Sequence, residues 1–139
     1  MTLAAPNSRC QDHSSTSHGT ADGRWQGRIL AGAGLALLPW LGYLAGTIPP
    51  KEAAAWVALD ALEAACLLAA GIRLVHADPR HRASAAAAAL LLVADACIDV
   101  ATAAPGAELV GALAMALGAE LPLAALCTVL AVRSPATSR

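Results

Sequence analysis

Four long apolar runs constrain the fold of this chain more than any other feature. They cover approximately 29–48, 54–76, 83–104 and 108–132. A helix rises about 1.5 Å per residue, so each run is long enough to cross the ~30 Å hydrocarbon core of a bilayer. Only 14% of the residues are charged, whereas about 25% are charged in a typical soluble domain. The sequence therefore predicts an all-α membrane protein with four transmembrane helices.

The connections between the apolar runs are short. They read "PPKE" at 49–52, "ADPRHR" at 77–82 and "PGA" at 105–107. Proline ends a helix because it has no amide hydrogen and restricts the residue before it. Short connections also place consecutive helices side by side in opposite directions. We therefore predict an antiparallel four-transmembrane-helix bundle that forms one domain over 25–133.

The two ends of the chain are polar. Residues 1–24 are rich in serine, threonine, histidine, glycine and aspartate and show no hydrophobic periodicity. A segment of this composition cannot bury enough apolar surface to order itself. We therefore predict a disordered cytoplasmic tail over 1–24 and a second cytoplasmic tail over 134–139.

The basic residues predict the orientation in the membrane. Lys51 is the only one associated with the first and third connections. The others lie on the opposite side of the bilayer: Arg9, Arg24, Arg28, Arg73, Arg80, Arg82, Arg133 and Arg139. Positively charged loops stay in the cytoplasm. The pattern predicts a multi-pass protein of the cell (inner) membrane with both termini inside.

Five acidic residues interrupt the last three apolar runs, and they are Asp60, Glu63, Asp95, Asp99 and Glu120. Their positions in the runs place all five near the middle of the membrane or slightly towards its outer side. Residues three or four apart share one face of a helix. Charged groups within a membrane face the protein interior or a water-filled cavity. We therefore predict a buried carboxylate layer that serves as a structural polar centre or as a proton or cation site.

The layer needs hydrogen-bond donors or protons because Arg73 is the only nearby cation. Two desolvated carboxylates one turn apart repel each other, so we expect Asp95 or Asp99 to be protonated at neutral pH. Buried indole and hydroxyl groups seek acceptors. The candidate hydrogen-bond partners are Trp40, Tyr43, Thr47 and Thr102.

Two features predict local helix geometry. Pro122 removes a helix hydrogen bond and leaves the carbonyl of Gly118 without its partner, which predicts a weak helical segment around Glu120. Gly42 and Gly46 form a GxxxG pattern, which permits close helix packing. This pattern has two readings: packing within the chain or a dimer face.

Neither a metal site nor a cofactor is expected. His13 and His18 lie in the polar tail, where we interpret them as solvated side chains. The cysteines follow no CxxC spacing, and a cysteine in an apolar helix behaves as a small hydrophobic residue. We interpret them as packing residues: Cys10, Cys66, Cys97 and Cys127.

Catalysis and nucleic-acid binding are not expected either. The chain has no GxSxG or HExxH motif, no P-loop and no dinucleotide-binding glycine pattern. It also has no basic patch for a nucleic acid. The sequence favours a structural or accessory membrane subunit, in contact with the lipid bilayer and with a second copy or another membrane protein. The alternative is a proton- or cation-handling transporter or channel component.

Four segments carry a resemblance to a known group of proteins. From about 36 to 132, "PWLGYLAGTIP", "WVALDALE", "DACIDVATAAPG" and "ELPLAALC" resemble small uncharacterised four-helix integral membrane proteins of high-GC Gram-positive bacteria. In that group an aromatic pair is more common where this chain has Cys97 and Ile98. The resemblance implies a shared topology and acid layer, and it implies no activity.

Overall fold

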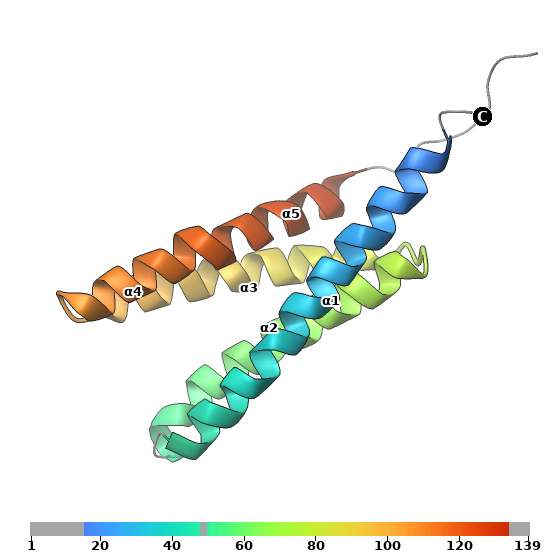
Figure 1. Cartoon of the computed structure of the whole chain (residues 1–139). Helices are drawn as coiled ribbons and strands as arrows, with labels where there is room; N and C mark the ends of the chain where they lie inside the picture. Colours follow the sequence, from blue (N-terminus) through green and yellow to red (C-terminus); the bar gives the residue numbers. More distant parts are fainter. Residues whose placement is uncertain (1–15, 48–49, 134–139) are drawn as a thin grey trace, which may run out of the picture.

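The computed structural model describes residues 16–47 and 50–133, and its regular elements are all helices. They are α1 (Thr16–Thr47), α2 (Pro50–Val75), α3 (His81–Thr102), α4 (Ala107–Met115), the π-helical turn η1 (Ala116–Glu120) and α5 (Leu121–Val132). The elements α4, η1 and α5 follow one another without a break (Figure 1).

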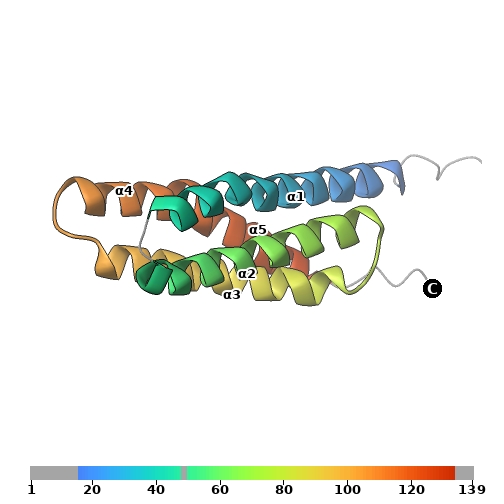
Figure 2. The same cartoon turned by 90° about the horizontal axis from the view of Figure 1, so that it is seen from below.

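Four helices are long and apolar enough to cross a membrane, and the prediction of four such helices is confirmed. Their apolar spans are Gly23–Thr47, Ala54–Val75, His81–Thr102 and Ala107–Val132. Helix α1 packs against α2, α2 against α3, and α3 against the helix formed by α4, η1 and α5 (Figure 1, Figure 2). The chain therefore consists of two helical pairs that meet along α2 and α3.

Helix α1 begins earlier than the sequence predicts. Residues 16–24, assigned above to the disordered tail, form its first turns. Nucleating a helix is costly, but extending an existing helix adds one hydrogen bond for each residue that becomes fixed. The long apolar helix can therefore continue into a polar segment that would not order itself alone. The remainder of that tail, 1–15, and the tail over 134–139 lie outside the described residues.

Glycines bring the backbones of α1 and α2 into contact. A Cβ atom built on Gly71 would lie 2.5 Å from the carbonyl oxygen of Gly27 and 2.6 Å from the backbone nitrogen of Ala31. Around Gly42 and Gly46, no atom of the described residues, outside their own local helix, lies within 4 Å of such a Cβ. The described residues therefore do not pack closely against Gly42 or Gly46, and the close approach of α1 to α2 occurs at other glycines.

A compact apolar core joins α1, α2, α3 and α5 near the α2–α3 connection. Its largest fully buried side chains are Leu30, Leu67, Leu92 and Cys127, and most of its other members are alanines. Farther from this connection, α4 has no buried residue. There the α1–α2 pair diverges from α3 and α4 (Figure 1). The molecule is thus tightly packed in one half and open in the other.

Two arginines form hydrogen bonds between helices in the packed half. Arg73 of α2 donates a hydrogen bond to the Ser84 hydroxyl of α3. The Nε of Arg82 donates to the carbonyl oxygen of Ala131 in α5 at 2.9 Å. Arg73, the only cation that the sequence places near the acids, is therefore engaged at the end of the helices.

Candidate carboxylate site

The acidic residues lie directly beyond the apolar core, on the side of its open half. On α3, Asp95 follows the buried Leu92 by one turn, and Asp99 follows one turn later. Glu120 precedes the buried Ala124 by one turn. Residues at this spacing share a helix face. The acids therefore continue the inward faces that form the core.

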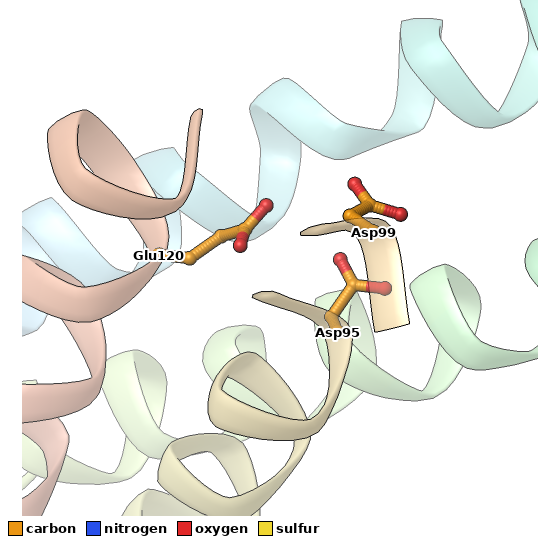
Figure 3. A group of neighbouring side chains, drawn as sticks. All are labelled: Asp95, Asp99 and Glu120. Carbon is orange, nitrogen blue, oxygen red and sulfur yellow. The ribbon is translucent and has the colours of Figure 1, made fainter. Parts of the chain in front are cut away.

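Three of the acids converge. Asp95 and Asp99 come from α3, and Glu120 comes from the end of η1. Each contributes one carboxylate oxygen to a group in which all the oxygens lie within 4.8 Å of one another. The Glu120 side chain extends towards Asp95 and Asp99, which lie beside each other (Figure 3). Two consecutive membrane-length helices thus build one cluster of three carboxylates, here called the triad.

The two acids of α2 border the triad. Glu63 is 4% exposed and Asp60 is 8% exposed. Glu63 interacts electrostatically with Asp95 and Glu120, and Asp60 interacts with Asp99. All five carboxylates therefore belong to one electrostatic unit.

Glu120 is the most unusual member. Its side chain is 8% exposed, and within the described part of the chain its buried Oε2 has no hydrogen-bond partner. Next to it, the N–H of Leu121 donates to the carbonyl oxygen of Ala116, five residues earlier. The weak segment predicted around Pro122 is therefore a π-helical turn, an irregularity that occurs frequently at functional sites.

The predicted hydrogen-bond donors behave in two ways. Trp40 lies close enough to Asp60 for its indole to act as a hydrogen-bond donor, and its ring stacks on Tyr43 at a centroid distance of 5.6 Å. Thr47 and Thr102 instead donate at 2.8 Å to the carbonyl oxygens of Tyr43 and Ile98. A hydroxyl carries one proton, and threonine in a helix commonly gives it to the preceding turn. These two threonines therefore do not donate to the acids.

The helical segments around the acids contribute no positive charge. Residues 54–72 and 83–132 contain no lysine, arginine or histidine. Carboxylates without a basic partner bind protons or cations, and oxygen ligands of this kind favour hard metal ions. The arrangement is therefore suited to holding positive charge.

No known protein family, curated protein or solved structure matches the chain. The sequence predicted the individual acids but missed the convergence of Asp95, Asp99 and Glu120 into the triad. Spacing rules detect ligands that are close in sequence, whereas the α3–α4 connection and the whole of α4 separate Glu120 from Asp99. The sequence feature that could have indicated the triad is depth in the membrane, because Asp95 and Glu120 both lie near the midpoints of their apolar runs.

Proposed function

We propose that this chain is a multi-pass membrane protein that takes up protons or a cation at its five carboxylates, as a component of a transporter or channel. The buried, unpartnered Oε2 of Glu120 carries this proposal. A purely structural polar centre pairs its buried acceptors with donors, because an unpaired buried acceptor costs about 1–3 kcal/mol. Here the carboxyl group that carries this oxygen lies beside two further carboxyl groups. A proton or a cation removes this cost.

The packing supports access to the acids from one side. Leu67 and Leu92 close the core between the acids and the α2–α3 connection. Asp95 and Asp99 remain partly exposed towards the end at which α3 turns into α4. An ion therefore reaches the acids from the open half, while the apolar core separates them from the opposite side.

We infer an antiparallel bundle in the cell (inner) membrane with both termini in the cytoplasm, and the distribution of basic residues supports it. Reporter fusions truncated at Pro50 and Arg80 test this topology. At Pro50, a reporter that works only outside the cytoplasm is expected to be active. At Arg80, only a reporter that works in the cytoplasm is expected to be active. An external Arg80 would overturn the topology and would reverse the side from which ions arrive.

Ion flux in proteoliposomes tests the proposed function. We expect the purified chain to carry protons or cations down an imposed gradient, measured with pH-sensitive and cation-sensitive dyes. Removing charge with Asp95→Asn and Asp99→Asn together, or with Glu120→Gln alone, is expected to reduce flux to the level of protein-free vesicles. Glu108→Gln is the matched control because Glu108 is exposed in the first turn of α4. Wild-type vesicles as tight as empty ones would contradict the proposal.

A structural or accessory subunit is the second candidate. Its support is the open half, where Leu35, Leu38, Trp40 and Tyr43 of α1 are exposed. A second copy or another membrane protein would cover such side chains in an assembly. This candidate predicts no ion flux, together with loss of assembly on gel filtration when Asp95 and Asp99 are both replaced by asparagine.

A further inference from the structure

We propose that Asp95, Asp99 and Glu120 bind a hard divalent cation of the size of Ca²⁺. The inference deepens the proposed function and rests on it, because it assigns the ion that the carboxylate layer takes up. It concerns the triad alone, since Asp60 and Glu63 border these three residues without belonging to the convergent group.

The upper limit on the spacing of the three oxygens is compatible with calcium. They all lie within 4.8 Å of one another. Calcium binds oxygen at about 2.3–2.6 Å, so ligands on opposite sides of the ion are separated by about 4.6–5.2 Å. Magnesium binds at about 2.0–2.1 Å, which requires at most about 4.0–4.2 Å between opposite ligands. A separation of up to 4.8 Å between ligand oxygens therefore falls within the span that Ca²⁺ allows and extends beyond the span that Mg²⁺ allows.

Ligand chemistry and charge point to the same class of ion. All three ligands are carboxylates, which select hard cations, and neither thiolate nor imidazole belongs to the group. No basic side chain lies in 83–132 to neutralise them. A divalent ion compensates more of this negative charge than a monovalent ion or a single proton does. The partial exposure of Asp95 and Asp99 leaves room for water, which commonly completes the coordination of Ca²⁺.

Glu120 distinguishes the triad from a solvated acidic cluster. More than nine-tenths of its side chain is buried, and its Oε2 has no partner among the described residues. Its carboxyl group points towards Asp95 and Asp99 (Figure 3). Glu120 ends the π-helical turn Ala116–Glu120, and it lies on the buried face of that turn. A buried carboxyl group directed at two further carboxyl groups is accounted for by a cation between them.

Calcium binding to the full chain in detergent micelles tests the inference. After treatment with a chelator, isothermal titration calorimetry is expected to show one Ca²⁺ per chain and weaker binding of Mg²⁺. Glu120→Gln is expected to weaken Ca²⁺ binding by about tenfold or more, because even partners of metal ligands contribute about 10–100-fold. Asp99→Asn is the second triad variant, and circular dichroism verifies that both variants stay helical. Glu108→Gln is expected to bind as the wild type does.

Each remaining outcome bears on one of the two proposals. The absence of saturable binding at about 1 mM Ca²⁺, the range of the weakest natural calcium sites, overturns the calcium inference. Equal affinity of wild type and folded triad variants, or equal binding of Na⁺, also overturns it. If proton flux then still depends on Glu120, the proposed function stands without calcium. Calcium binding without any ion flux supports the triad and overturns the transport function.

Discussion

The isolated α3 segment is expected to insert poorly into a membrane, and replacing Asp95 and Asp99 with leucine is expected to make insertion efficient. An aspartate near the centre of a helix costs about 2.5–3.5 kcal/mol on the biological insertion scale, and a leucine contributes about −0.3 to −0.6. Each substitution therefore favours insertion by about 3–4 kcal/mol, and by less for Asp99, which lies nearer the end of the segment. Glycosylation mapping of the segment His81–Thr102 in microsomes measures the inserted fraction.

The large apolar side chains of α3 cannot offset both acids. Together they return only about 2–3.5 kcal/mol, and they are Leu90, Leu91, Leu92, Val93, Ile98 and Val100. The matched control replaces the exposed Ala94 and Ala101 with leucine, which adds the same side chains and leaves the acids in place. Efficient insertion of the wild-type segment would show that the acids are not held near the centre of the bilayer.

The sequence alone was sufficient to predict the four helices. Within hydrocarbon a chain must satisfy its backbone hydrogen bonds internally, so an apolar run of this length has few alternatives to a helix. Depth and spacing were likewise sufficient to predict that Asp95 and Asp99 share one side of α3. Both inferences depend on properties of a single helix, which a sequence displays directly.

The contacts between helices could not be predicted from the sequence. Whether Glu120 meets Asp95 depends on the angle at which α3 crosses the last helix and on the π-helical turn before Leu121. Pro122 indicated a weakness there, but a missing hydrogen bond does not specify how a helix rearranges. The Thr102 hydroxyl could donate either to the backbone of its own helix or to an acid on another helix. It donates to the carbonyl oxygen of Ile98, because that acceptor lies in the preceding turn.

The same distinction applies to glycine, because identical residues have opposite roles on different faces. Gly71 allows α1 and α2 to approach until their backbones touch, whereas no atom of the described residues outside its local helix lies within 4 Å of a Cβ built on Gly111. Composition and GxxxG matching cannot separate these two cases. The choice depends on which face of each helix meets its neighbour.

Gly71→Ala is expected to destabilise the chain by about 1–3 kcal/mol, the usual cost of overpacking. The added methyl group would lie 2.5 Å from the Gly27 carbonyl oxygen. Backbone atoms cannot rotate away as a side chain does, so α1 must move from α2, and Trp40 with it. Alanine's helix propensity offsets at most about 1 kcal/mol of this cost.

Gly111→Ala is the matched control, since it gains the same propensity without a clash and is expected to leave stability unchanged or higher. Unfolding in mixed micelles with increasing SDS, followed by circular dichroism, measures both variants, and equal stability of the two would contradict the close contact between α1 and α2.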